Sequence, residues 1–206
     1  MIDLDKSDTG IWTVTLNRPD KANSLTPEML EDLAQIALDA QSARGFILTG
    51  VGKVFSAGAD LDAAKAGLAT SGVWEKLSSR IAALECMTIA ALNGTLAGGA
   101  MGMALACDLR IAVPSAKFFY PVMKLGFLPQ PSDPRRMAGL IGPARTKMIL
   151  MSGQKITADL AYYYGLIDRI VEPDDLIQTA QDLLADSVSA TAQHSAAIKA
   201  MIDAHN

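Results

Sequence analysis

The spacing of apolar and polar residues divides the N-terminal third of the chain into alternating strands and helices. Residues 11–16 (IWTVTL) alternate between apolar and Thr or Trp positions, which predicts a strand. Thr26 and Pro27 then supply the cap and the first position of a helix. The apolar residues of this helix share one stripe: Met29, Leu30, Leu33, Ile36 and Ala37. The run 46–49, closed by Gly50, predicts a short buried strand.

The same alternation continues along the rest of the chain. We expect helices over residues 71–84, 99–106, 135–151 and 158–165 and from Asp174 onward, and strands over residues 88–92, 109–113 and 166–171. Pro129, Pro131 and Pro134 predict a stiff loop before the helix at 135. Strands that alternate with helices favour an α/β fold with parallel pairing.

Composition indicates a single globular domain, with at most a short appendage. The chain has 206 residues, of which 50% are hydrophobic and 5% aromatic. Its net charge of -4 argues against nucleic acid or an anionic membrane as a partner. The start, MIDLDKSDTG, lacks the apolar run of a signal peptide. Cys86 and Cys107 lie in apolar surroundings and are expected to be buried free thiols in a cytoplasmic protein.

An uncharged stretch from Cys86 to Cys107 is long enough to span a bilayer. Turn-forming residues interrupt it, however, at Asn93-Gly94 and again at Gly98-Gly99. A strand, a turn and a buried helix therefore explain this stretch better than a membrane span.

Positive charge is concentrated between residues 109 and 158, where eight Lys or Arg residues accompany one acid, Asp133. Two interpretations remain open for this segment. It is either a solvated basic face or a surface for an anionic small molecule such as a phosphorylated carrier.

Two glycine-rich turns are the strongest candidates for chemistry. One is FSAGADL (55–61), after a short strand, and the other is NGTLAGGAMG (93–102), between a strand and a helix. Backbone N–H groups exposed at such a junction favour negative charge, so a pair of them suits a developing thioester enolate. Tight turns with close helix packing would explain the same glycines.

Dinucleotide binding is a rival interpretation of the second turn. Ala97-x-Gly99-x-x-Gly102 nearly matches the G-x-G-x-x-G motif. Ala replaces the first Gly, the unit lies in mid-chain, and residues 116–122 contain no acid where the ribose partner belongs. These three departures argue against a nucleotide site.

Five segments in register resemble the enoyl-CoA hydratase/isomerase (crotonase) family. They are LNRPDKANSL (16–25), FSAGADL (55–61), ALNGTLAGGAMGMALACDLRIA (91–112), AKFFYPVMKLGFLP (116–129) and LIGPARTKMILMSGQKITADLAYYYGLIDRIVEP (140–173). The resemblance implies a crotonase-like (ClpP/crotonase) α/β spiral of ββα units. We expect a core over residues 1–172 and a truncated C-terminal helical segment over 173–206.

The resemblance also implies site residues. The family's oxyanion-hole N–H groups fall on Ala59 and Gly99, and Asp108 matches a structural acid beside the active-site helix. The positions matched to contacts with CoA or the acyl group are Ala22, Ala57, Gly58, Asp60, Leu61, Gly98, Tyr120, Val122 and Gln130.

At three positions where members of the family carry an acid, this chain carries none. The two glutamates of the hydratases correspond to Gly102 and Val122, and a third acid of some members corresponds to Gln130. None of these side chains can transfer a proton, which argues against hydration by the two-glutamate mechanism.

Few other groups are available as an acid or base. Asp133 is the nearest acid in the chain, although a surface or packing role explains it, as it does Asp62 and Glu85. The two histidines, His194 and His205, lie in the terminal helical stretch, so a catalytic triad in the core is not expected. No cluster suits a metal.

The sequence therefore predicts a protein that binds an acyl-CoA thioester, with CoA as part of the substrate and no tightly bound cofactor. It is expected to act as an isomerase, hydrolase or decarboxylase rather than a hydratase. The alternative is a non-catalytic CoA-thioester binder or accessory subunit. The family implies a homotrimer or a dimer of trimers, an expectation that the chain's end at Asn206 weakens.

Overall fold

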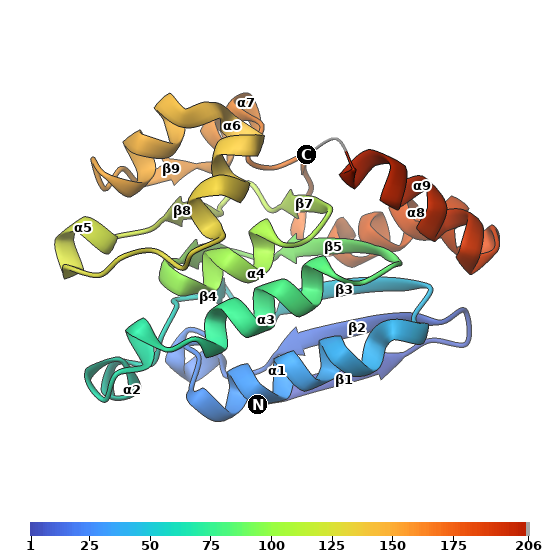
Figure 1. The fold of residues 1–206 in the computed structure, drawn as a ribbon, viewed down its shortest axis with the longest axis horizontal. Coiled ribbons are helices and arrows are strands. Elements are labelled where there is room, and N and C mark those ends of the chain that lie inside the picture. Colours follow the sequence, from blue (N-terminus) through green and yellow to red (C-terminus); the bar gives the residue numbers. More distant parts are fainter. Residues whose placement is uncertain (205–206) are drawn as a thin grey trace.

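The protein has an α/β architecture in which helices pack on a twisted, mainly parallel sheet (Figure 1). This computed structural model describes residues 1–204. His194 lies in the last helix, as predicted, whereas His205 is outside the described residues.

The larger sheet carries the core. Its strands, in spatial order, are β1 (Ile2–Lys6), β2 (Ile11–Leu16), β3 (Gly45–Gly50), β5 (Met87–Leu92), β7 (Leu109–Ala112) and β10 (Arg169–Ile170). β1 runs antiparallel to β2, and the other neighbours are parallel. Residues 45–49 of β3 are all buried, because helices cover both faces of a parallel sheet.

A smaller sheet positions the two glycine-rich turns. It consists of β4 (Val54–Ser56), β6 (Thr95–Ala97), β8 (Lys117–Phe119) and β9 (Ile156–Thr157), in that order. β4, β6 and β8 are parallel, and β9 is antiparallel to β8. Since β4 and β6 are neighbours, the turns that follow them lie at the same edge of the sheet.

Helices α1 (Pro27–Asp39), α3 (Val73–Ala82) and α4 (Met101–Leu105) lie side by side along the larger sheet (Figure 1). The predicted start of α1 is confirmed, since the Thr26 side chain accepts a hydrogen bond from the Met29 N–H. The remaining α-helices are α2 (Leu61–Lys65), α5 (Val122–Leu125), α6 (Asp133–Leu150), α7 (Ala158–Tyr164), α8 (Leu176–Ser189) and α9 (Ala192–Asp203). Short 3₁₀ turns are η1 (Pro19–Lys21), η2 (Ala40–Ser42), η3 (Leu68–Thr70), η4 (Gly98–Ala100) and η5 (Pro173–Asp175).

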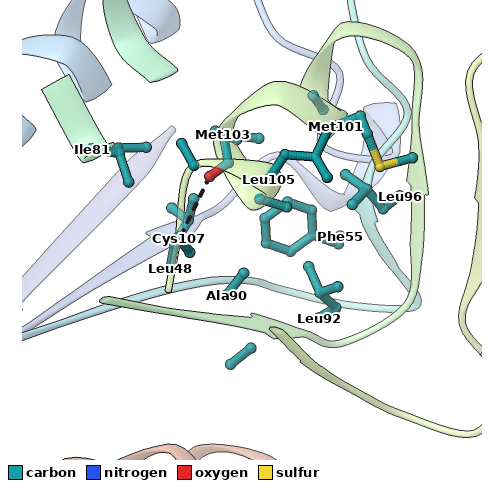
Figure 2. Close-up of a cluster of buried hydrophobic side chains, with 14 of the residues drawn as sticks. Leu48, Phe55, Ile81, Ala90, Leu92, Leu96, Met101, Met103, Leu105 and Cys107 are labelled. Carbon is teal, nitrogen blue, oxygen red and sulfur yellow. Dashed lines mark hydrogen bonds between the residues drawn. The ribbon is translucent and has the colours of Figure 1, made fainter. Parts of the chain in front are cut away.

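The core beneath α4 is built from small and aliphatic side chains around a single ring. Figure 2 shows Phe55 of β4 between Leu92 of β5 and Leu105 of α4, with Leu96 beside them. Phe55 is fully buried, and burial of such a side chain contributes roughly 1.5–3 kcal/mol to stability. Both cysteines are free and buried, as predicted.

Several predicted boundaries are wrong, each for a local reason. The strand expected over 166–171 is limited to Arg169–Ile170, because Leu166 and Ile167 are buried in the turn after α7. The helix expected over 135–151 is broken at Gly142, whose φ of 78° and ψ of 161° are not helical. β1 was not predicted, because an edge strand buries few of its side chains. The division at residue 172 stays a prediction.

Candidate functional site

The two glycine-rich turns meet at the ends of β4 and β6. Gly58 and Gly98 have φ angles of 90° and 59°, in the left-handed region that favours glycine. A Cβ on Gly58 would lie 3.0 Å from the Ala97 carbonyl oxygen and 3.5 Å from the Gly98 Cα. Two backbones approach each other here at a distance that a side chain would prevent.

The Ala59 N–H is directed away from its strand partner. Residues 57–60 pair in parallel with Leu25, whose N–H donates to Gly58 O at 2.8 Å. The Asp60 N–H in turn donates to Leu25 O at 2.9 Å. In a parallel bridge the middle residue, Ala59, then directs its own N–H away from Leu25.

Gly99 presents a second unused donor. It is the second residue of the 3₁₀ turn η4, where an N–H has no intrahelical acceptor. Ala59 and Gly99 are both half-buried, so a ligand can reach them. Trp74 of α3 lies against this position, because a Cβ on Gly99 would be 3.2 Å from the indole ring.

The segment matched to CoA contacts is tied to the first glycine turn. Ala57 N–H donates to Ala22 O at 3.0 Å, and Ser56 Oγ donates to Asn23 O at 2.8 Å. Ala22 and Asn23 have φ angles of 50° and 51°, which are uncommon for residues with a side chain. The buried Asn23 amide donates to Val54 O at 2.8 Å and helps to hold this conformation.

Asp60 has a structural role in the same loop. Its carboxylate accepts from Arg18 at 2.8 Å and from the Asp62 and Ala63 N–H groups, so it caps α2. The Arg18 hydrogen bond, followed by the Ala63 N–H, holds the pKa of Asp60 below its usual value. Leu61, the first residue of α2, is largely exposed.

Asp133 lies beside the second glycine-rich turn, where the sequence had offered a surface or packing role as the alternative, and its burial excludes only the surface role. It is fully buried at the first position of α6. Tyr120 Oη donates to its Oδ2 at 3.0 Å, whereas Oδ1 has no hydrogen-bond partner among the described residues. Burial raises the pKa of Asp133 to about 7, although the Tyr120 hydrogen bond and the charge of Arg136 both lower it.

The Asp133 carboxyl group fills the space beside Gly102 that a side chain at residue 102 would need. A Cβ on Gly102 would lie 2.7 Å from Oδ1 and 3.2 Å from Oδ2 of Asp133. The carboxyl group therefore stands beside the position at which the family's first glutamate would leave the helix. Gly99 and Gly102 are three residues apart, so they lie on one face of the turn that continues into α4.

Tyr120 and Gln130 are the neighbours of this carboxyl. The Gln130 N–H donates to Tyr120 Oη at 3.4 Å, and its side-chain amide donates to Ala69 O at 3.5 Å. Burial, followed by the charge of Asp133, raises the pKa of Tyr120, so the phenol remains a donor. Val122, also buried, begins α5 two residues beyond Tyr120.

Sequence reasoning missed Glu75 of α3. Its carboxylate accepts hydrogen bonds from the N–H and hydroxyl of Ser132, next to Asp133. Burial alone would raise the pKa of Glu75, but the Ser132 hydrogen bonds and the charge of Arg136 outweigh it, and the pKa lies below its usual value. No local signal identifies Glu75, because its partner is 57 residues away in the chain.

Other candidate residues lie outside this group. Asp62 is exposed, and Asp108 accepts from the Thr88 N–H at 2.8 Å and from Lys199 at 2.7 Å, a structural arrangement. Arg110 belongs neither to a solvated basic face nor to a surface for an anionic molecule, because it is 3% exposed and donates to the carbonyl oxygens of Leu166 and Cys107.

One hollow on the surface lies elsewhere. It has a volume of about 450 Å³ and is lined by residues of β10, η5 and α8, including Arg169, Glu172 and Asp182. Within residues 1–204, no set of three or more His, Cys, Asp or Glu side chains is grouped to hold a metal. The same part of the chain contains no helix with the length and apolarity that a membrane crossing requires.

Comparison of the sequence with known proteins identifies a family and several relatives. A family model described as enoyl-CoA hydratase/isomerase matches residues 6–206. The chain is 34% identical to the short-chain-enoyl-CoA hydratase of Clostridium acetobutylicum over 188 residues, which cover 87% of this chain and 72% of that protein. It is 33% identical to the 1,2-epoxyphenylacetyl-CoA isomerase of Escherichia coli over 192 residues, with coverage of 87% and 73%.

Solved structures give the same result for the fold. The enoyl-CoA hydratase of Bacillus anthracis superposes with a TM-score of 0.91 and 31% sequence identity, over 98% of this chain and 82% of that one. The crotonase-like α/β fold predicted from the sequence is thereby confirmed.

Proposed function

Since this chain belongs to the enoyl-CoA hydratase/isomerase family, we propose that it binds an acyl-CoA thioester and stabilises the enolate formed from it. The thioester oxygen would lie between the N–H groups of Ala59 and Gly99. The observation that carries this proposal is the meeting of the two turns, which leaves both donors unused and accessible.

Backbone donors suit this chemistry because they are fixed before the substrate arrives. Negative charge develops on the thioester oxygen as the α carbon loses a proton or a carboxylate group. Two N–H groups that already point at that oxygen stabilise the charge without reorganisation, and loss of one such donor costs about 10²–10³ in rate. Side chains at residues 59 and 99 are not needed for this effect.

The neighbouring loop is the proposed contact for the CoA portion. Ala22 and residues 57–61 are held together by the Ala57–Ala22 hydrogen bond and by the Arg18–Asp60 ion pair. Gly98 gives the ligand room to approach the main chain at the second turn. Tyr120, Val122 and Gln130 would line the acyl side of the site.

The reaction proposed is isomerisation, thioester hydrolysis or decarboxylation rather than hydration. Each of these uses an enolate or a tetrahedral oxyanion, which the two N–H groups can hold. Hydration by two glutamates is disfavoured because Gly102 and Val122 stand at their positions. CoA enters as part of the substrate, and no tightly bound cofactor is proposed.

A non-catalytic CoA-thioester binder or accessory subunit is the second candidate. The observation that favours it is the absence of an acid at Gly102, Val122 and Gln130. The family also supports a homotrimer or a dimer of trimers in the cytoplasm, and this stays a proposal.

Titration with a panel of CoA esters tests binding, and assays with crotonyl-CoA and a 3-enoyl-CoA test turnover. The Ala59 donor is tested by replacing Ala59 with lactic acid, which exchanges the N–H for an ester oxygen and keeps the methyl group. We expect turnover to fall about 100- to 1000-fold. Binding without turnover in the unmodified protein would favour the second candidate, and failure to bind any CoA ester would exclude both.

A matched control is available in α9. Ala192 is the first residue of that helix, so its N–H also has no intrahelical acceptor. Lactic acid at residue 192 should leave turnover within about twofold of the unmodified protein. An equal loss at both residues would indicate that the backbone ester itself, and not the missing Ala59 donor, disturbs the protein.

A further inference from the structure

The carboxyl group of Asp133 is held as a reactive group would be held, with one oxygen fixed and the other unused. Oδ2 accepts from Tyr120 at 3.0 Å, and the phenol is itself fixed by the Gln130 N–H. Oδ1 is buried with no hydrogen-bond partner among the described residues. A buried acceptor without a partner costs about 1–3 kcal/mol, and a catalytic role is one of the reasons for which such groups occur in native proteins.

The absence of a side chain at Gly102 makes room for this group. Any Cβ there would lie 2.7 Å from Oδ1, closer than real Cβ contacts allow. Gly102 is three residues after Gly99, so its backbone lies slightly less than one helical turn, about 4.5 Å along the axis, from the proposed oxyanion donor, and the carboxyl lies beside Gly102. An acyl chain whose thioester oxygen is held by Gly99 would bring its α carbon toward Oδ1.

Three charged or titratable groups face the Asp133 carboxyl. They are Tyr120 before α5, Glu75 on α3 and Arg136 one turn along α6. Arg136 also carries a buried nitrogen without a partner among the described residues. The pKa of about 7 that results lets the carboxyl exchange a proton at neutral pH.

We propose that Asp133 is the proton-transfer group of this site, acting through the space left by Gly102, with Tyr120 as its positioning residue. This rests on the proposed thioester function. The carboxyl enters from α6, 31 residues beyond Gly102 in the chain, and replaces an acid that the helix α4 itself does not carry.

A single carboxyl group can move the double bond of the substrate, because it takes up one proton at C2 and returns it at C4. No further reactant is needed. The Asp133 carboxylate removes a proton from C2 of a 3-enoyl thioester, the C–H electron pair forms the C1–C2 π bond of an enolate, and the π electrons of the C1–O double bond move to the oxygen. The negative charge then rests on the thioester oxygen, between Ala59 and Gly99. When the enolate collapses, a double bond forms between C2 and C3, the C3–C4 π electrons take the proton back from Asp133 at C4, and the carboxylate is regenerated.

The test is solvent exchange together with isomerisation. Proteins are incubated in deuterium oxide with hexanoyl-CoA and 3-hexenoyl-CoA, and deuterium at C2 and the 2-enoyl product are measured. We expect Asp133→Asn to lower both rates at least about 100-fold and to leave the Kd for the esters within about threefold. Asp62→Asn, an exposed acid beside the first turn, should leave both rates unchanged.

Tyr120→Phe separates positioning from structure. The Tyr120 hydrogen bond lowers the pKa of Asp133, so its removal should move the acidic limb of the pH–rate profile to higher pH. A phenol needed only for packing would leave that limb in place. The double variant Gly102→Glu with Asp133→Gly returns a carboxyl to α4 and should recover at least about tenfold of the activity lost in Asp133→Asn.

The experiments separate failure of the Asp133 proposal from failure of the thioester function. Wild-type rates in Asp133→Asn would overturn the proposal, as would a wild-type protein that binds the esters but neither exchanges deuterium nor isomerises them. An unmoved pH limb in Tyr120→Phe would overturn the role given to Tyr120. Failure of the wild-type protein to bind any CoA ester would instead overturn the thioester function on which the proposal rests.

Discussion

Two glycines of the site are required for different physical reasons. Gly58 is needed for its conformation and for the close backbone approach at Ala97, whereas Gly102 is needed only for the space that Asp133 fills. Glycine at residue 102 lies within a helix and lowers the stability of that helix by about 1 kcal/mol relative to Ala.

Gly58→Ala tests the close approach of the two turns. The substitution places a side chain at a φ of 90°, which costs about 1–2 kcal/mol, and also brings Cβ to 3.0 Å from Ala97 O. Gly67→Ala is the matched control, with a φ of 103° and no atom within 4 Å of the new Cβ. Urea unfolding should show Gly58→Ala to be the less stable variant by at least about 1 kcal/mol, and equal losses would contradict the contact.

Gly102→Ala is the corresponding test of the space beside Asp133. The added Cβ should displace the carboxyl or α6, so we expect turnover to fall at least about tenfold despite the better helix propensity. Gly139→Ala, in α6 with open space around its Cβ, should instead leave turnover unchanged and raise stability by about 0.5–1 kcal/mol. Unchanged turnover in Gly102→Ala would contradict the steric argument.

The raised pKa of Asp133 has a consequence for stability. The native state keeps a proton on Asp133 up to about pH 7, whereas the unfolded chain releases it near pH 4. The contribution of Asp133 to the free energy of unfolding is therefore full below pH 4, decreases between about pH 4 and 7, and is constant above. Tyr120, Glu75 and Arg136 face the carboxyl and share in setting this window.

Asp133→Asn should remove the contribution of Asp133 to the pH dependence of the unfolding free energy. Each pH unit between the pKa of a group in the folded protein and its pKa in the unfolded chain corresponds to about 1.4 kcal/mol. We therefore expect the decrease in unfolding free energy between pH 5 and pH 8 to be smaller by a few kcal/mol in the variant. Urea titrations of both proteins at the two pH values give the comparison. An identical pH dependence would show that Asp133 ionises as an ordinary carboxyl.

Part of the site was predictable from the sequence at this scale and part was not. The two glycine-rich turns are local motifs, because a turn's backbone geometry is determined by the residues within it, and the resemblance to the family places the proposed donors at Ala59 and Gly99. Asp133 was named only as the nearest acid in the chain, since its contact with Gly102 depends on how α6 packs against α4. Glu75 was missed for the same reason.

At the scale of elements, a single buried arginine joins three segments. Arg110 of β7 donates to Cys107 O after α4 at 2.7 Å and to Leu166 O after α7 at 2.9 Å. A positive charge at the end of α4 also complements the negative end of the helix dipole. Arg110 therefore ties the end of α4 and the turn after α7 to strand β7 of the larger sheet.

Arg110→Met should be strongly destabilising, by about 3 kcal/mol or more, because it leaves buried carbonyl oxygens without donors. Arg169→Met, an exposed change on the neighbouring strand β10, should alter stability by less than about 0.5 kcal/mol. Thermal and urea unfolding of both variants provide the comparison. A small effect of Arg110→Met would mean that water replaces the lost donors.

Elements were predicted best where burial follows a clear period. The cap at Thr26 and the stripe of α1 are local features, and both are confirmed. β1 was missed because four of its five residues are exposed, and β8 and β9 because strands of three and two residues show no period. The pairing of β4 with β6, on which the site depends, joins segments about 40 residues apart and has no local signal.

For the whole molecule, the attachment of α9 is mainly polar. None of the residues of α9 is buried, and Lys199 donates to Asp108 at 2.7 Å and to Cys86 O at 3.0 Å. Ile198, Met201 and Ile202 on the same helix are exposed. Lys199 thus ties α9 to the larger sheet beside β5.

Lys199→Met should loosen α9 without unfolding the core. We expect amide hydrogen exchange in residues 192–203 to accelerate at least about fivefold while β3 and β5 keep their protection. Lys65→Met removes an exposed ion pair on α2 and should change neither. Unchanged exchange in α9 would show that its packing on α8 suffices.

A structure of the protein with a bound, unreactive acyl-CoA ester would show where the thioester lies. We expect the thioester oxygen within about 3 Å of both the Ala59 and Gly99 nitrogens. We also expect the α carbon to face Oδ1 of Asp133 across Gly102. A thioester oxygen in contact with neither nitrogen, or an α carbon on the far side of α4 from Asp133, would show that the proposed site is wrong.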